Sequence, residues 1–246
     1  MTAEVENRPP PGSVAVRRAR LRAGLLVALT FGAGATDIVG FLGLNQVFTA
    51  NMTGNIVLLG LAASQAQWFE FALCAAATLA FAAGLLGGFL AIGQSDLQGM
   101  WPSRVTAALG ADLVLQAAFW VGWALNDAQP RGYMILILVV LSSAAMGVQT
   151  AAARRLAVAG VTTTFVTGTM TSVMAGLAAK HGEATLLRTV VIVSLAAGAA
   201  VAGALFAVAP LGAALIGPLS VAVVIGMARL ARLHRAPDLA ESAISH

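Results

Sequence analysis

The chain has 246 residues, of which 59% are hydrophobic and only 10% are charged, and its formal net charge is +4. A soluble domain carries about 25% charged residues to build its polar surface, so this composition excludes an ordinary soluble fold. The Lys and Arg residues gather at the two ends and in short breaks between apolar runs, which argues against a nucleic-acid partner and is typical of a chain oriented in a lipid bilayer.

Apolar runs of membrane length follow one another along the chain. Residues 1–22 are polar and predict a disordered cytoplasmic tail. A run of 18 or more apolar residues with few charges predicts a transmembrane helix. The predicted spans are, in chain order, residues 23–44, 71–93, 105–125, 132–153, 189–209 and 211–228, and residues 229–246 form a basic and polar cytoplasmic tail. The sequence therefore predicts an all-α integral membrane protein.

Two further apolar stretches, residues 46–63 and 161–179, differ from these spans. Each begins with β-branched and polar residues, which favour an extended backbone. Each then reaches a Thr-Gly pair surrounded by residues that cap helices, which is typical of a helix start. The polar residues and glycines at these two starts are Asn51, Thr53, Gly54, Asn55, Thr167, Gly168 and Thr169. The helical part that follows is about three turns long, too short to cross a bilayer, so each stretch predicts a broken, re-entrant segment.

The two halves of the chain share an order of elements. In each half, one long span precedes the broken stretch and two long spans follow it. Thr53-Gly54 aligns with Thr167-Gly168, although the following Gly-Leu-Ala-Ala matches need a gap. The sequence therefore predicts two internal membrane repeats, residues 23–125 and residues 132–228.

The direction of the second repeat depends on whether the broken stretches cross the membrane. If they do, the chain crosses eight times and the repeats are parallel. If each stretch dips in and returns, the chain crosses six times and the repeats are inverted. The positive-inside rule favours the second topology, because it places all Lys and Arg residues except Arg131 on the side of the N-terminus. The eight-crossing topology stays open, since an extended segment plus a short helix is just long enough to span the bilayer core.

Inverted repeats bring the two helix starts together near the midplane of the membrane. Many transporters build their substrate site in this way. The partial positive charge and free N–H groups at a helix N-terminus suit an anionic or strongly polar solute. We therefore take the seven residues at the two helix starts as the candidate substrate-binding residues.

Two aspartates lie inside predicted spans and are candidates for coupling a proton or cation. A carboxylate deep in a membrane is costly and usually faces a cavity or a partner. For Asp37 the alternative is a purely structural hydrogen bond to the neighbouring broken stretch. Asp112 has Gln116 one turn later on the same helix face, and hydrogen bonding between helices is its alternative role. Gln149 and Thr150 occupy the approximate counterpart of Asp37 in the second half and are uncharged.

Several short strings carry a resemblance to a known family. They are Gly34-Ala35-Thr36-Asp37, Phe41-Leu42-Gly43-Leu44 and above all Ala50-Asn51-Met52-Thr53-Gly54-Asn55. With these strings the chain resembles the YoaK-like family of bacterial membrane proteins over both repeats. The resemblance implies a protein of the bacterial inner membrane with about six spans, and it supplies no activity and no substrate.

Catalysis and cofactor binding are not expected. Cys74 is the single cysteine, and the three histidines lie outside the spans without metal-ligand spacing. A membrane aspartyl protease needs both carboxylates in one site, and neither Asp37 nor Asp112 lies in a recognisable protease motif.

Two functions remain. The first is a transporter or channel for a small polar or anionic solute, and the alternative is a non-transporting membrane partner or sensor protein. Gly84 and Gly88 predict close helix packing, either within one chain or between the copies of a homo-oligomer.

Overall fold

The computed structural model describes residues 11–93, 101–156, 166–179 and 182–231. These residues form eight α-helices and no strand. The helices are α1 (Pro11–Gly43), α2 (Met52–Ser64), α3 (Trp68–Ile92), α4 (Ser103–Leu125), α5 (Tyr133–Leu156), α6 (Val166–Ala178), α7 (Gly182–Phe206) and α8 (Pro210–Leu230). The all-α fold predicted from the sequence is therefore confirmed for the described part of the chain.

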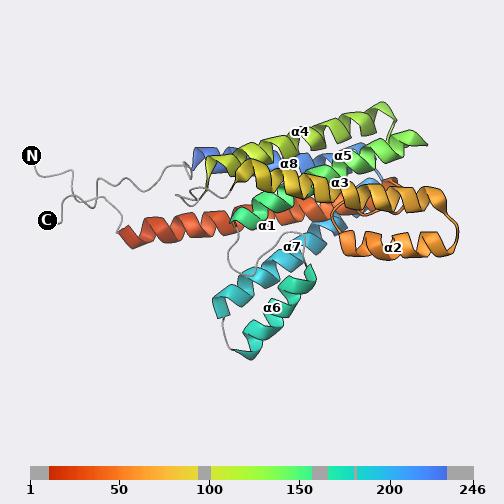
Figure 1. The fold of residues 1–246 in the computed structure, drawn as a ribbon. Helices are drawn as coiled ribbons and strands as arrows, with labels where there is room; N and C mark the ends of the chain where they lie inside the picture. The colour runs from red at the N-terminus through yellow and green to blue at the C-terminus, as the bar shows by residue number, and fades with distance from the viewer. Residues whose placement is uncertain (1–10, 94–100, 157–165, 180–181, 232–246) are drawn as a thin grey trace, which may run out of the picture.

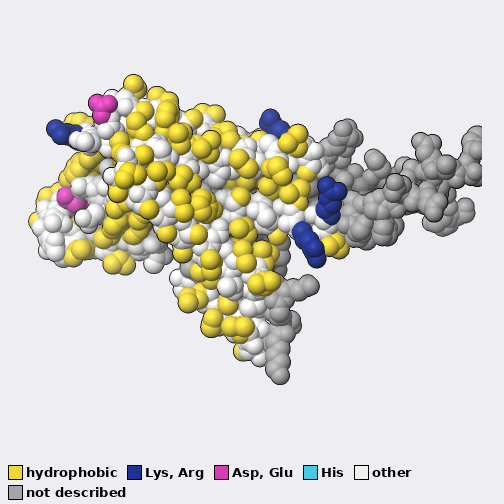
Figure 2. All heavy atoms as spheres, turned by 180° about the vertical axis from the view of Figure 1, so that it is seen from behind, with side chains coloured by type: hydrophobic (Ala, Val, Ile, Leu, Met, Phe, Trp, Pro, Cys, Tyr) yellow, Lys and Arg dark blue, Asp and Glu magenta, His cyan; other side chains and the backbone are white. Residues whose placement is uncertain are grey.

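Six of these helices are long and apolar enough to cross a bilayer: α1 over Ala19–Gly43, α3, α4, α5, α7 over Thr185–Phe206, and α8. They alternate in direction (Figure 1), so the start of α4 and the end of α8 lie at one end of the bundle, and the ends of α1 and α4 lie at the other. We call these the Arg104 end and the Arg131 end. Hydrophobic side chains cover the middle of the surface, whereas charged side chains lie at the two ends (Figure 2). This distribution matches the apolar core and polar faces of a bilayer, so the protein is an integral membrane protein.

The helix α2 does not cross the bundle. After α1 ends at the Arg131 end, residues 44–51 turn back into the bundle; we call this segment the strap. The reversal uses Asn45 and Gln46, both in the left-handed region with φ of 61°. From the end of the strap, α2 runs out to the Arg131 end again, where α3 begins (Figure 1). Its 13 residues span about 20 Å, less than the bilayer core of about 30 Å.

The N-terminal boundary of the first span was predicted wrongly. Residues 11–22, which the sequence assigned to a disordered tail, form the first turns of α1. Proline suits the first turn of a helix, and the Ala and Arg residues that follow have high helix propensity, so the helix extends beyond the apolar run. The rest of the two predicted tails, residues 1–10 and 232–246, lies outside the described residues, as does the predicted extended stretch at residues 161–165.

The helices pack in a pattern that pairs the two halves of the chain. The helix α1 packs against α7 and α8, and α5 packs correspondingly against α3 and α4. The pairs α2–α3 and α6–α7, and the pairs α3–α4 and α7–α8, correspond in the same way, and α1–α5 and α4–α8 join the halves. If α1, α2, α3 and α4 are exchanged with α5, α6, α7 and α8, respectively, the same set of contacting helix pairs results.

Glycines bring the most extensive of these contacts to backbone distance. A Cβ atom on Gly34 of α1 or on Gly198 of α7 would overlap the backbone of the other helix. Gly84 of α3 and Gly147 of α5 face each other's helices in the same manner. The close packing that the sequence predicted around Gly84 is thus a contact within one chain. The alignment that pairs Thr53-Gly54 with Thr167-Gly168 also pairs Gly84 with Gly198 without a gap.

Candidate functional site

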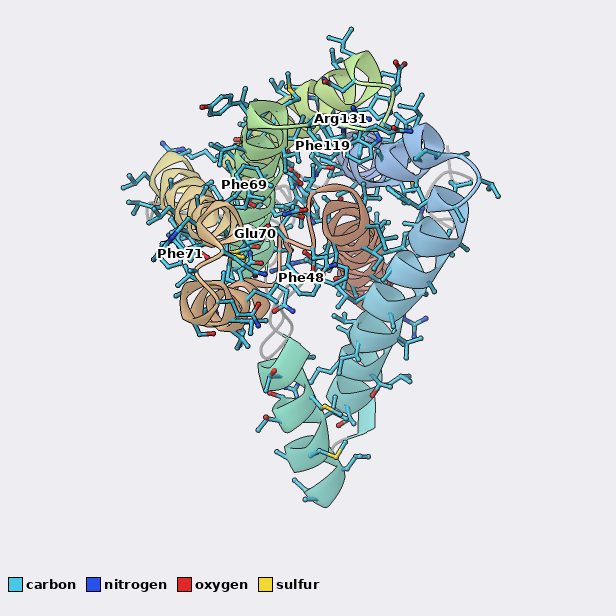
Figure 3. The ribbon with its side chains drawn as sticks, turned by 90° about the vertical axis from the view of Figure 1, so that its right-hand side faces the viewer. Phe48, Phe69, Glu70, Phe71, Phe119 and Arg131 are labelled. Atoms are coloured by element: carbon cyan, nitrogen blue, oxygen red, sulfur yellow. The ribbon has the colours of Figure 1, made fainter. Side chains whose placement is uncertain are left out.

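A cavity of about 550 Å³ lies beside α1, between the strap, the start of α2, the start of α6 and the middle of α7. Its lining residues are Ala33, Asp37, Phe48, Ala50, Asn51, Thr53, Gly54, Val57, Leu58, Thr167 and Leu195. In the view onto the Arg131 end, Phe48 lies among α1, α2 and the beginning of α6 (Figure 3). The cavity is thus formed where the two short helices begin.

Asp37 sets the depth to which the strap enters the bundle. Its Oδ1 accepts hydrogen bonds from the backbone N–H groups of Thr49 and Ala50, each at 2.8 Å. Asp37 lies about 9 Å along α1 from the helix end at Gly43, given a rise of 1.5 Å per residue. Backbone that is not helical at this depth must form hydrogen bonds within the protein or line a water-filled cavity. The Asp37 carboxylate therefore makes the structural hydrogen bonds to the neighbouring stretch that were the alternative to ion coupling. It also lines the cavity.

Two asparagines fix the rest of the strap. Asn51 caps α2, since its Oδ1 accepts from Gly54 N–H at 3.2 Å, as the sequence predicted for a helix start. The side chain of Asn55 is fully buried and bonds to both backbone groups of Phe48. Its Nδ2 donates to the Phe48 carbonyl at 2.6 Å, and its Oδ1 accepts from the Phe48 N–H at 3.0 Å. The Asn55 side chain thus makes the two hydrogen bonds to Phe48 that the backbone of a neighbouring strand would make.

Gly54 provides space for an aromatic ring of the strap. A Cβ atom at this position would lie 2.9 Å from Phe48 Cδ2 and 3.0 Å from Asn51 Nδ2. The Phe48 ring in turn stacks on Phe41 of α1, with ring centroids 4.8 Å apart. The absence of a side chain at Gly54 thus lets the strap pack closely on the first turn of α2.

The structure brings together some of the predicted site residues and separates others. Asn51, Thr53, Gly54 and Thr167 line the cavity together with Asp37. The three remaining candidates at the helix starts, Asn55, Gly168 and Thr169, are not among its lining residues. Asn55 is engaged with the strap, the Gly168 carbonyl accepts from Ser172 Oγ at 2.9 Å, and Thr169 is buried.

The apolar lining residues from other elements could not have been named from the sequence. Phe48 belongs to the strap, and Ala33 and Leu195 come from the facing helices α1 and α7. None of the three carries a polar side chain, and the contact between α1 and α7 joins distant parts of the chain. The Gly34 and Gly198 positions that create this contact were the only possible signal.

The described lining of the cavity includes one acidic side chain and no basic one. Asp37 is the single charged residue among its described lining residues. The backbone donors nearest to the start of α2 are partly engaged, because Asp37 takes two N–H groups of the strap and Asn51 takes that of Gly54. The arrangement therefore offers threonine hydroxyl groups and the Asn51 amide, with little positive potential left for an anion.

Asp112, the second candidate for ion coupling, lies outside this cavity. It is fully buried in α4, where its Oδ1 accepts from Gln116 Nε2 at 2.8 Å. The same Nε2 lies 3.4 Å from Gln149 Oε1 on α5, and Gln149 Nε2 donates to the Leu29 carbonyl on α1 at 3.2 Å. The bonds between helices are thus made by Gln116 and Gln149, and Asp112 is joined to them through Gln116. In the described part of the chain, no group of three or more His, Cys, Asp or Glu side chains is arranged to hold a metal ion.

Comparison with known proteins identifies the family of the chain. The family model described as "Protein of unknown function (DUF1275)" matches residues 25–228. The chain belongs to this family. A curated relative, the UPF0700 transmembrane protein YoaK of Bacillus subtilis (strain 168), is 36% identical over 182 residues, which cover 72% of this chain and 79% of the relative. The family predicted from the sequence is thus confirmed, and so is a multi-pass membrane protein. No solved structure matches the chain.

Proposed function

We propose that the protein is a membrane transporter or channel for a small polar solute, and that the solute binds in the cavity between the starts of α2 and α6. The observation that carries this proposal is the shared lining of the cavity. Thr53 from the first short helix and Thr167 from the second lie in one cavity with Asp37, which is about 9 Å along α1 from the helix end. Polar side chains at that depth are costly unless they serve a partner or a polar pathway.

We propose further that the two halves of the chain are inverted repeats. The helices α1 and α5, which begin the two halves, run in opposite directions (Figure 1). The exchange of halves preserves the helix contacts and pairs the glycines of the α1–α7 and α3–α5 contacts. Repeats of this kind, with short helices that start near the middle of the membrane, suit alternating access to a central site.

The chemistry of the cavity favours an uncharged polar solute over an anion. An anion would lie beside the Asp37 carboxylate, and no described basic side chain lines the cavity to compensate. Hydroxyl groups of Thr53 and Thr167 and the amide of Asn51 can exchange hydrogen bonds with hydroxyl or amide groups of a solute. We therefore narrow the polar or anionic class expected from the sequence to small neutral polar molecules.

The orientation proposed for the protein follows from its arginines. Arg104, Arg154 and Arg155 lie at the Arg104 end, together with the end of α8. Positive charge is enriched on the cytoplasmic side of membrane proteins. We propose a bacterial inner-membrane location with both termini in the cytoplasm.

One feature favours the alternative function, a partner or sensor protein. Among the described helices α6 packs only against α7, and α6 extends away from the other helices together with the beginning of α7 (Figures 1 and 3). Its exposed side chains include Met170, Met174 and Leu177. An apolar helix held away from the bundle offers a contact surface for another membrane protein.

A solute screen by thermal stabilisation tests the proposal. Purified protein is heated with small neutral polar compounds and, separately, with small anions, because a bound solute raises the unfolding temperature. We expect stabilisation by a neutral polar compound that is lost in Thr53→Val and Thr167→Val. Thr189→Val is the control, since Thr189 lies on α7 and bonds to the Thr185 carbonyl outside the cavity. An unchanged response in both cavity variants would contradict the site, and co-purification of a membrane protein without any solute response would favour the alternative.

A further inference from the structure

The polar cluster around Asp112 leaves two buried acceptors without a hydrogen-bond partner. Asp112 is 0% exposed and Gln116 is 2% exposed. Gln116 Nε2 donates to Asp112 Oδ1, but Asp112 Oδ2 and Gln116 Oε1 have no partner. Each buried polar atom left without a partner costs free energy, and an isolated carboxylate at membrane depth costs more. The cluster therefore lacks something that would bond to both oxygens.

A single proton would satisfy both oxygens. A carboxylic acid and a primary amide pair through two hydrogen bonds when the amide N–H donates to the carbonyl oxygen and the acid O–H donates to the amide oxygen. The first of these two bonds is present between Gln116 and Asp112. The second bond requires a proton on Asp112 Oδ2, which would donate to Gln116 Oε1. These are the two atoms that have no partner.

The charged groups around the cluster offer no other neutralising partner among the described residues. The helix α4 packs against α3, α5 and α8, and Gln149 connects the cluster to α1. The charged or titratable side chains that the structure describes on these helices are Arg17, Arg20, Arg22 and Asp37 on α1, Glu70 and Cys74 on α3, Tyr133, Arg154 and Arg155 on α5, and Arg229 on α8. Arg17 precedes the membrane-spanning part of α1, and the other arginines, Glu70 and Tyr133 lie in the first or last turns of the spans. Asp37 carries a negative charge when ionised. No basic side chain of the described residues thus reaches Asp112.

The cluster contacts the element that forms the solute cavity. A Cβ atom placed on Gly217 of α8 would meet both Thr36 Oγ1 and Gln116 Oε1, so these two oxygens lie beside the same glycine. Thr36 is followed directly by Asp37, which holds the strap and lines the cavity. The helix α1 therefore presents adjacent residues to the cluster and to the cavity.

We propose that Asp112 is the proton-binding residue of this protein, with Gln116 as the amide that pairs with its neutral acid. Uptake of a proton converts the carboxylate into a carboxylic acid and adds the second hydrogen bond of the pair. Its release restores the carboxylate and leaves Gln116 Oε1 free to move toward Thr36. In this way the site couples protonation to the position of α1. The coupling rests on the proposed transport function, whereas proton binding itself does not.

Infrared spectroscopy of the purified full-length protein in lipid tests proton binding without any solute. We expect a carboxylic-acid C=O band that decreases in one transition as the pH rises and that is absent in Asp112→Asn. This variant keeps two-point pairing with Gln116 and is expected to fold. Asp37→Asn controls for the other membrane carboxylate and should retain the band. Gln116→Leu should shift the band frequency and the pH of the transition, because it removes the pairing amide.

Three results would overturn the proposal. They are the absence of an Asp112-dependent band, a band that does not change with pH, and a band that responds to the addition of sodium chloride in place of pH. The last result would assign the oxygens to a sodium ion. A normal titration of Asp112 combined with no solute stabilisation would support the proton site and contradict the proposed transport function, so the two failures are distinguishable.

Discussion

The side chain of Asn55 bonds to both backbone groups of Phe48, at 2.6 Å to the carbonyl and at 3.0 Å to the N–H. The two residues lie on opposite sides of the turn into α2, so this contact closes the strap on the helix that it leads into. Together with the bonds from Thr49 and Ala50 to Asp37, it satisfies consecutive backbone groups of a segment that is not helical inside the bundle. The start of α2 is thereby held beside the cavity, which is the basis of the predictions below.

Replacing Asn55 tests this closure. Asn55→Leu leaves the buried N–H and carbonyl of Phe48 without partners, and we expect it to lower the free energy of unfolding by about 2–4 kcal/mol. Asn51→Ala is the matched comparison, because it removes one exposed capping bond and should cost about 1 kcal/mol. Thermal or denaturant unfolding in detergent measures both. Equal effects of the two variants would show that the Phe48 contact does not hold the strap.

Asp37 can be examined for its structural role separately from any ionic role. Asp37→Asn keeps an oxygen acceptor for the amides of Thr49 and Ala50, whereas Asp37→Leu removes it. We expect hydrogen exchange of these two amides to remain slow in Asp37→Asn and to become at least tenfold faster in Asp37→Leu. Rapid exchange of both amides in the unmodified protein would contradict the bonds to Asp37.

The glycines of the helix contacts provide a test of the packing symmetry. A Cβ atom on Gly84 would overlap the Ala144 backbone, so Gly84→Ala should destabilise the protein by about 1–3 kcal/mol, and Gly198→Ala should have a similar effect against Phe31. Gly87 lies on the same helix as Gly84 with no atom near its Cβ position, so Gly87→Ala should be neutral or stabilising by up to about 1 kcal/mol. Unfolding measurements on the three variants suffice. A cost for Gly84→Ala without one for Gly198→Ala would argue against equivalent halves.

The proposed orientation is open to labelling of single cysteines after Cys74→Ala. Ser103 is exposed at the Arg104 end, and Gln129 is exposed at the Arg131 end. In intact cells a membrane-impermeant reagent should label Gln129→Cys and leave Ser103→Cys unlabelled until the cells are opened. The reverse pattern would place both ends of the chain outside the cytoplasm. Labelling of both positions in intact cells would contradict an odd number of crossings between them.

Residues close together in sequence were sufficient to predict the helices. The site was predicted only in part, because it depends on contacts between residues that are distant in sequence. The Asn51 cap and the six spans follow from residues close together in sequence. The Asn55 contact with Phe48 could not be predicted, because it depends on the strap turning back to Asp37. Asn55 was therefore assigned to solute binding along with Thr53, whereas the structure directs its side chain to the backbone. Residues 11–22 were missed because their helix extends beyond the apolar run that marks the membrane.

The central claim is that Thr53 faces a polar pathway inside the membrane, and accessibility of a cysteine at this position tests it most directly. In protein with Cys74→Ala, we expect Thr53→Cys to react with a small water-soluble thiol reagent in lipid vesicles. Leu79→Cys is the comparison, because Leu79 is 71% exposed on the apolar surface of α3 and should face lipid. Reaction of Thr53→Cys at least tenfold faster than that of Leu79→Cys would support a water-accessible solute site. Equally slow reaction at both positions would show that the cavity is closed to water and would contradict the proposed function.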